Sequence, residues 1–272
     1  MLSERTIIVN SNCYHGFPLE AAVEGIVKAG FHNIELTATK GWTEHVFPDQ
    51  SFKRLVDVRR MLRDKGITVA AMSGHTNLMD SGRIADFVDN IELAHFFGAP
   101  VIVTSVGEAH IKDMASGGDE LVASHIASFL PLLEDYGMSL VLETHGEHGT
   151  ATRLRKITSL VDSPRVGICY DTANAIFYGD VKGCEDVEAN ADAIGYIHIK
   201  DKAGERTEWN FPALGEGYVD FPALLSTLDA KGNTAPLSIE IEFTSAGPAN
   251  LEEVDQALVT SARYLEGLGY RL

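Results

Sequence analysis

The stretch LVASHIASFLPLLEDYGMSLVLE, residues 121–143, contains one complete unit of the pattern that recurs along the chain. Its first part, Leu121–Tyr136, has the apolar spacing of a helix that covers a core, and Gly137 stands where a left-handed cap ends such a helix. Its second part, Met138–Glu143, is an almost unbroken apolar run that ends on a carboxylate. Such runs are typical of parallel strands buried on both faces. The stretch therefore predicts a helix followed by a buried strand with an acidic side chain at its carboxyl end.

Comparable apolar runs recur along the chain, separated by segments of helical length. We predict strands at Thr6–Asn10, Asn33–Leu36, Ile67–Met72, Pro100–Ser105, Met138–Glu143, Val166–Asp171, Ile194–Lys200 and Pro236–Ile241. We predict helices that end at a glycine at Leu19–Ala29, Phe52–Lys65, Ile84–Phe97, Leu121–Tyr136, Asp220–Lys231 and Leu251–Leu265 (followed by Gly267), and shorter ones at Thr152–Val161 and Glu185–Asp192. Eight alternating strands and helices favour an α/β protein with one (β/α)8 TIM barrel domain over residues 1–272. An open doubly wound sheet is the alternative, but its glycine fingerprint does not follow the first strand.

The composition is that of a globular protein with a large excess of acidic residues. Asp and Glu number 39 against 22 Lys and Arg, which gives a net charge of −17 and argues against a nucleic-acid partner. Cys13, Cys169 and Cys184 form no C-x-x-C pair, which excludes a disulfide scaffold and a zinc knuckle. The amino-terminal residues are charged where a signal peptide needs an apolar run, and no apolar run approaches ~20 residues. We therefore expect a cytoplasmic protein without a membrane partner.

Four polar residues close apolar runs on consecutive predicted strands: Glu143, Asp171, His198 and Glu240. In a barrel of this type the carboxyl ends of the strands surround the active site. Three carboxylates buried together repel one another unless a cation lies between them. Three oxygen ligands and one nitrogen ligand suit Mn²⁺, with Mg²⁺, Co²⁺ and Zn²⁺ as alternatives. We predict a divalent metal site here; the competing interpretation is a set of solvated rim carboxylates around a structural histidine.

The last strand offers two acidic residues for this site. Glu240 and Glu242 share one face of the strand and differ in depth by about 6–7 Å. Glu240 lies nearer the apolar run, so we predict it as the ligand and place Glu242 at the rim.

Further polar side chains are candidates for contact with a substrate. His145 lies one step beyond Glu143 on the same face, where it either orients substrate, transfers a proton or hydrogen-bonds the metal ligands. Lys200 stands in the same relation to His198, where it either stabilises an oxyanion or forms a rim salt bridge. The other predicted substrate-binding residues, each with a structural role as the alternative, are Glu35, His75, Asn174 and Trp42, and Glu108 and His110 are polar residues that follow the fourth strand.

Together these segments resemble the xylose-isomerase-like barrels of the sugar phosphate isomerase/epimerase family, which includes ketose 3-epimerases and inosose isomerases and dehydratases. The resemblance implies a divalent metal held by Glu143, Asp171, His198 and Glu240. It also implies that Glu143 and Glu240 act as acid and base on opposite faces of a small carbohydrate substrate, beside a carbonyl. The motifs that carry it, over essentially the whole chain, are Asn33-Ile-Glu-Leu36, Val141-Leu-Glu-Thr-His145, Ile168-Cys-Tyr-Asp-Thr-Ala-Asn174, Ile197-His-Ile-Lys-Asp201, Leu214-Gly-Glu-Gly-Tyr-Val-Asp-Phe221 and Leu237-Ser-Ile-Glu-Ile-Glu242.

Two departures from the family pattern keep other functions open. Asn174 stands where many members have a histidine, which contacts substrate in the epimerases and binds a further zinc in the abasic-site endonucleases. The His145 element favours a lyase or dehydratase acting on a keto-sugar, an inosose or a 3-keto-glycoside, with His145 as acid or base. We therefore expect an isomerase or epimerase first, a lyase second, and a non-catalytic sugar-binding barrel or partner subunit third. We expect no DNA-repair nuclease, and a homo-oligomer stays open.

Overall fold

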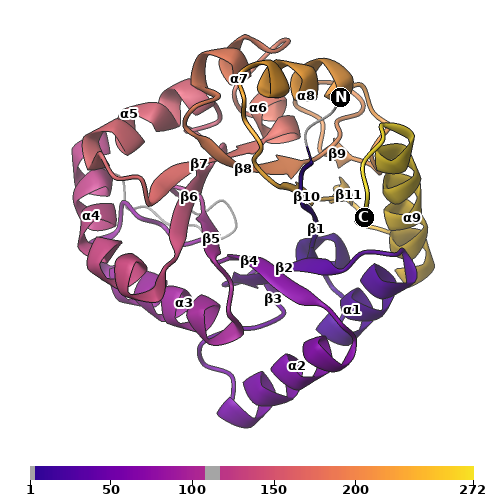
Figure 1. The fold of residues 1–272 in the computed structure, drawn as a ribbon, viewed down its shortest axis with the longest axis horizontal. Helices are drawn as coiled ribbons and strands as arrows, with labels where there is room; N and C mark the ends of the chain where they lie inside the picture. The colour runs from indigo at the N-terminus through magenta and orange to yellow at the C-terminus, as the bar shows by residue number, and fades with distance from the viewer. Residues whose placement is uncertain (1–3, 108–116) are drawn as a thin grey trace.

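A closed barrel of parallel strands forms the centre of the chain in the computed structural model, which describes residues 4–107 and 117–272 (Figure 1). In the described part, each barrel strand pairs in parallel with its neighbours, and β1 pairs with both β10 and β2, which closes the ring. This confirms the predicted (β/α)8 barrel. The barrel strands are β1 (Ile7–Asn10), β2 (Asn33–Thr39), β4 (Thr68–Ser73), β5 (Val101–Thr104), β6 (Ser139–Glu143), β7 (Val166–Asp171), β8 (Ile194–Ile199) and β10 (Leu237–Ile239).

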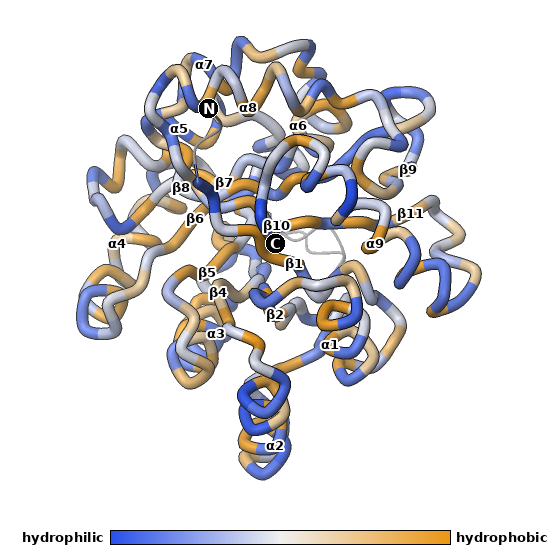
Figure 2. The backbone as a smooth tube through the Cα atoms, turned by 45° about the vertical axis from the view of Figure 1, so that its right-hand side comes forward, coloured by the Kyte–Doolittle hydropathy of each residue, from blue (hydrophilic) through white to orange (hydrophobic). Residues whose placement is uncertain are grey.

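Amphipathic helices cover the outside of the barrel. Figure 2 shows strands that are mostly hydrophobic, whereas the helices alternate between hydrophobic and hydrophilic residues along their turns. This alternation is what a helix needs when one face packs on the strands and the other meets water. The covering helices are α1 (Leu19–Lys28), α2 (Phe52–Asp64), α3 (Ile84–Phe97), α4 (Asp119–Tyr136), α5 (Ala151–Val161), α7 (Glu185–Asn190), α8 (Phe221–Ala230) and α9 (Leu251–Gly267).

The predicted glycine stop of the last helix is wrong by two residues. Gly267 belongs to α9, and Gly269 adopts the left-handed conformation instead, with φ of 94°. The backbone N–H of Tyr270 then donates to Leu265 O at 3.0 Å, which closes the helix end. Gly267 and Gly269 could each adopt the left-handed conformation, and the hydrogen bond to Leu265 forms with the turn at Gly269. The other predicted stops hold: the glycines that have positive φ just after their helices are Gly30, Gly66, Gly98, Gly137 and Gly232.

Several short elements decorate the barrel and were not predicted. Helix α6 (Thr172–Phe177) begins directly after β7, with Asp171 as its N-cap. Two antiparallel pairings lie beside the barrel: β3 (Thr43–Glu44) pairs with β2, and β9 (Asn210–Phe211) pairs with β11 (Phe243–Thr244). Two short 3-10 helices are η1 (Ser11–Tyr14) and η2 (Ser81–Arg83).

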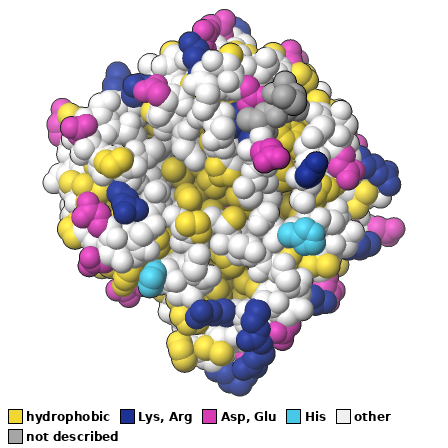
Figure 3. All heavy atoms as spheres, viewed as in Figure 1, with side chains coloured by type: hydrophobic (Ala, Val, Ile, Leu, Met, Phe, Trp, Pro, Cys, Tyr) yellow, Lys and Arg dark blue, Asp and Glu magenta, His cyan; other side chains and the backbone are white. Residues whose placement is uncertain are grey.

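The molecular surface separates charge from apolar side chains on the face drawn in Figure 3. Apolar side chains gather at the centre of this face, and Lys, Arg, Asp and Glu lie around its edge.

No helix within residues 4–107 or 117–272 has the length and apolar character needed to span a bilayer.

Candidate metal centre and active site

The candidate site is the polar layer directly above an apolar layer inside the barrel. The apolar layer is one buried cluster from six strands: Ile8, Ala71, Val103, Val141, Cys169 and Tyr196. Side chains alternate along a strand, so the residue two positions farther on again points inward. Those residues are Asn10, Ser73, Ser105, Glu143, Asp171 and His198. The change from apolar to polar within one step along the strands therefore creates the site.

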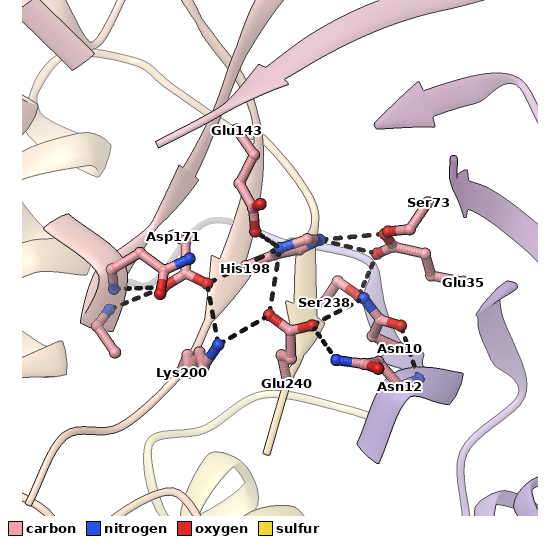
Figure 4. A network of polar contacts seen from close by, with 12 residues as sticks. Asn10, Asn12, Glu35, Ser73, Glu143, Asp171, His198, Lys200, Ser238 and Glu240 are labelled. Carbon is pink, nitrogen blue, oxygen red and sulfur yellow. Dashed lines mark hydrogen bonds and ion pairs between the residues drawn. The ribbon is translucent and has the colours of Figure 1, made fainter. Parts of the chain in front are cut away.

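Four of the polar side chains converge on a single point (Figure 4). His198 Nδ1 lies 2.7 Å from Glu143 Oε1, 3.6 Å from Glu240 Oε2 and 4.0 Å from Asp171 Oδ2. One ligand atom from each residue lies within 4.8 Å of all the others, and each residue is at most 6% exposed. The structure thus brings together the four residues predicted as a metal site. Glu242 does not belong to this group.

Asp171 provides a test of whether this group fits a cation. Its Oδ1 accepts the backbone N–H groups of Ala173 and Asn174 at 2.9 and 2.8 Å, which caps α6. Its Oδ2 is buried and has no hydrogen-bond partner among the described residues. A buried carboxylate oxygen without a donor is costly, and a metal ion at the point of convergence removes that cost. The donor set, three carboxylates and one imidazole, fits a divalent cation.

Glu35 lies beneath the cluster and contacts the other side of the His198 ring. His198 Nε2 lies 3.1 Å from Glu35 Oε1, and Ser73 Oγ donates to the same oxygen. Tyr196 Oη and Ser238 Oγ donate to Glu35 Oε2 at 2.9 and 2.7 Å. Glu35 is fully buried and is not among the residues that line the pocket above, so its position suits orientation of His198 rather than contact with a substrate.

Glu240 is held by two asparagines of the first strand and its following turn. Its Oε1 accepts from Asn12 Nδ2 at 3.0 Å and from Asn10 Nδ2 at 3.4 Å. The orientation of the Asn12 amide is fixed, because its Oδ1 accepts from Trp42 Nε1 at 3.0 Å and from Thr43 Oγ1 at 2.7 Å. Asn12 was not predicted as a site residue, although its place after the first strand was the available signal. It links the position of Trp42 to the orientation of Glu240.

Lys200 lies at the edge of the same cluster. Its Nζ is 3.3 Å from Glu240 Oε2 and 3.7 Å from Asp171 Oδ2, and it hydrogen-bonds Glu242 Oε2. The ammonium also lies 4.5 Å from the centre of the Phe211 ring. Burial acts to lower the pKa of Lys200, but the three carboxylates outweigh it and raise that pKa well above its ordinary value.

The buried cluster holds more acidic than basic side chains, and this shifts the pKa values of its members. Burial, reinforced by the charges of Glu143 and Glu240, raises the pKa of Asp171 well above its ordinary value. For Glu143 burial acts in the same direction, but the hydrogen bond from His198 and the nearby His75 hold its pKa well below the usual range. Burial lowers the pKa of His145 to about 4, so this imidazole is neutral at neutral pH. Five carboxyl groups (Glu35, Glu143, Asp171, Glu240 and Glu242) thus lie around His198 and Lys200, and His75 Nδ1 lies 3.8 Å from Glu143 Oε2.

An open pocket lies above the cluster. Glu143 and Glu240 line it, and so do five of the residues predicted to contact substrate or transfer protons: Trp42, His75, His145, Asn174 and Lys200. Trp209, which was not predicted, also lines the pocket. Asp171 and His198 lie deeper, and Glu108 and His110 fall outside the described residues.

A family model for the xylose isomerase-like TIM barrel matches residues 23–266. The chain belongs to this family. Two solved structures are similar over nearly the full length at low identity: L-ribulose 3-epimerase (TM-score 0.74, 22% identity, 98% of this chain and 94% of that one) and D-psicose 3-epimerase in the presence of D-fructose (0.78, 15%, 96% and 98%). A probable 3-DHS dehydratase from Bacillus anthracis has a TM-score of 0.70 at 17% identity, over 96% of this chain and 98% of that one. At these identities the similarity shows the shared fold.

Two curated relatives of this xylose isomerase-like chain match it over shorter segments. A 3-oxo-isoapionate decarboxylase of Pectobacterium atrosepticum is 33% identical over 105 residues, 36% of this chain and 38% of that protein. A probable endonuclease 4 of Methanoculleus marisnigri is 27% identical over 137 residues, 45% of this chain and 49% of that protein. The matches thus span less than half of either relative.

Proposed function

We propose that this chain is a divalent-metal-dependent sugar isomerase or epimerase that moves a proton at the carbon beside a carbonyl group. The observation that carries the proposal is the placement of Glu143 and Glu240. Both carboxylates approach His198 Nδ1, at 2.7 and 3.6 Å, and they do so from opposite sides (Figure 4). Two carboxylates that flank one point suit removal of a proton from one face of a carbon and its return on the other.

Glu143, Asp171, His198 and Glu240 would hold the metal, for which Mn²⁺ is our first choice. A divalent cation bound by them supplies Lewis-acid polarisation of substrate oxygens. The chain's own residues provide the rest: Glu143 takes the proton, and Glu240, oriented by Asn12, delivers one to the opposite face. His75, Asn174 and Lys200 offer hydrogen bonds to substrate oxygens, and Trp42 offers a flat apolar wall to a sugar ring.

Proton exchange with solvent tests this function. The Mn²⁺-loaded protein is incubated with a panel of ketoses in D₂O, and deuterium at the carbon beside the carbonyl is followed by NMR. The proposal expects an isomeric product that carries deuterium, formed by the wild type and not after chelation, with a large loss of rate in Glu143→Gln and Glu240→Gln. Binding of sugar without any metal-dependent exchange, unaffected by Glu143→Gln, would instead identify a non-catalytic barrel.

A lyase is the second candidate, favoured by the place and protonation state of His145. This residue lines the same pocket, and its pKa of about 4 makes it an acceptor of protons at neutral pH. The opening proton abstraction is common to both functions, and a lyase differs in that a leaving group departs. Release of water or an aglycone from keto-cyclitols or 3-keto-glycosides in the same assay, lost in His145→Gln, would favour the lyase.

A further inference from the structure

A second open pocket adjoins the one above the metal centre. We call it the outer pocket. It shares four lining residues with the inner one: Asn12, Trp42, Trp209 and Glu242. The two pockets therefore meet at these side chains, and a molecule bound at the metal centre lies next to the outer pocket.

Aromatic side chains from separate segments line the outer pocket. Trp42 lies after β2, Tyr178 after α6, Trp209 before β9, and Phe243 in β11. No Lys or Arg occurs among its described lining residues, and the one carboxylate, Glu242, is hydrogen-bonded to Lys200. This lining offers no charge partner to a phosphate or carboxylate. It offers flat apolar faces, which suit an uncharged ring.

The aromatic walls are fixed by contacts of their own. Trp42 stacks on His15 with ring centres 3.9 Å apart and an angle of 12°, while its Nε1 donates to Asn12. Trp209 packs edge-on against Phe211 at 5.0 Å. A wall that is already in place loses little conformational freedom when a ligand binds.

Phe243 adds an independent observation, because its backbone is strained. Its φ is +59°, in the left-handed region that a bulky side chain rarely adopts. The other described non-glycine residues with positive φ are Asp162 and Asp180, a residue type that tolerates this region. The pairing of Phe243 with Phe211 between β11 and β9 holds the strained backbone at the wall of the outer pocket. Such strain is concentrated at functional sites.

We propose that the outer pocket is a subsite for a second, uncharged ring of the substrate. The substrate class is then a keto-sugar that carries a ring through a glycosidic bond, not a free monosaccharide. The inference rests on the proposed function for its inner half, in which the sugar lies above the metal centre. The outer half rests on the aromatic walls and on the left-handed backbone of Phe243, so it can fail without the inner half, and the inner half without it.

Matched pairs of ligands test the subsite by calorimetry on the Mn²⁺-loaded protein. The ketose disaccharides turanose, lactulose and isomaltulose, which carry their second sugar at different positions of fructose, are compared with D-fructose. Phenyl β-D-glucopyranoside is compared with D-glucose, which separates an aromatic ring from a sugar ring as the occupant. The proposal expects at least one ring-bearing ligand to bind at least about tenfold more tightly than its parent, since stacking on aromatic walls favours the added ring. If no ring-bearing ligand gains over its parent, or if none binds, the subsite is overturned whatever the exchange assay gives.

Substitutions in the outer pocket test whether the tighter binding of ring-bearing ligands depends on its side chains. Phe243→Ala and Tyr178→Ala are expected to bring the ratio of affinities to about one, and Phe243→Gly, which also relieves the left-handed strain, is expected to do the same. Mn²⁺ affinity reports whether each variant keeps its fold. Phe52→Ala is the matched control, because this aromatic side chain is 71% exposed on α2, away from both pockets, and its loss leaves the ratio as in the wild type. A ratio that persists in Phe243→Ala and Tyr178→Ala contradicts the proposal.

Discussion

Glu35 contacts the Nε2 side of the His198 ring: Nε2 lies 3.1 Å from Oε1 and 3.2 Å from Oε2 of this fully buried carboxylate. The ring therefore presents Nδ1 to Glu143, Asp171 and Glu240. A carboxylate behind a ligating histidine fixes the orientation of the ring and increases its basicity. Glu35 thus determines that Nδ1 is the nitrogen that faces these three carboxylates.

Glu35→Gln is expected to weaken Mn²⁺ binding by about 10–100-fold, because the amide lacks the charge that supports His198. Titration calorimetry measures the loss. Glu24→Gln on the exposed face of α1 removes the same charge far from the site and leaves the affinity as it was. Equal Mn²⁺ affinity in Glu35→Gln and the wild type would show that Glu35 does not support the ligand.

Asp171→Asn separates metal binding from helix capping. The amide oxygen can still cap α6 in place of Oδ1, whereas an NH₂ group replaces Oδ2, which accepts no hydrogen bond from the described residues. In chelator we expect a melting temperature at least equal to that of the wild type, since the variant removes one charge from an acidic cluster. Mn²⁺ at about a hundred times Kd stabilises the wild type by about 2.7 kcal/mol and leaves the variant unchanged. A Mn²⁺-dependent rise of similar size in both proteins would remove Asp171 from the ligand set.

Metal affinity is expected to rise with pH. Burial and the neighbouring carboxylates raise the pKa of Asp171, so this group holds its proton to higher pH and must release it to bind a cation. The Kd for Mn²⁺ is therefore larger at about pH 6 than at about pH 8, by up to about tenfold per pH unit for each proton released. Calorimetry in buffers of different ionisation enthalpy counts those protons. A Kd that is flat with pH, and heats that do not depend on the buffer, would contradict this.

Asn12→Ala is expected to slow solvent exchange about tenfold with little change in Mn²⁺ affinity. Asn12 is not one of the four predicted metal ligands, but it donates a hydrogen bond to Glu240 and accepts one from Trp42. The variant removes both hydrogen bonds. Gln256→Ala, which removes an exposed amide on α9, is the control. If the rate and the metal affinity of Asn12→Ala fall together, Asn12 supports the metal site as a whole rather than orienting Glu240.

The barrel and its four-residue cluster could be predicted from sequence because both follow from local patterns. Apolar runs mark strands buried on two faces, and the alternation of side chains places Glu143 and Asp171 in one layer above Val141 and Cys169. The role of Glu35 could not be predicted in the same way. Its depth depends on the stagger between strands, including a shift in the β2–β4 register between Ile34 and Glu35. The stagger is set only when the strands pair, so the sequence of one strand does not reveal it.

The outer pocket could not be predicted because its walls are brought together by pairing between distant segments. Asn210–Phe211 meets Phe243–Thr244 in a two-stranded ribbon that is too short to leave a periodic signal. Helix α6 was missed for a related reason. Its six residues begin at the Asp171 cap and provide less than two turns of pattern.

Anomalous diffraction at the manganese edge, from crystals of the wild type grown with Mn²⁺, shows whether the four-residue cluster binds a cation. We predict one strong peak bound by Glu143, Asp171, His198 Nδ1 and Glu240, with Glu35 still on His198 Nε2. We also predict that the peak is absent from Asp171→Asn crystals grown under the same conditions. A wild-type structure with no peak among these four residues, or with its manganese bound elsewhere, would contradict the predicted metal site.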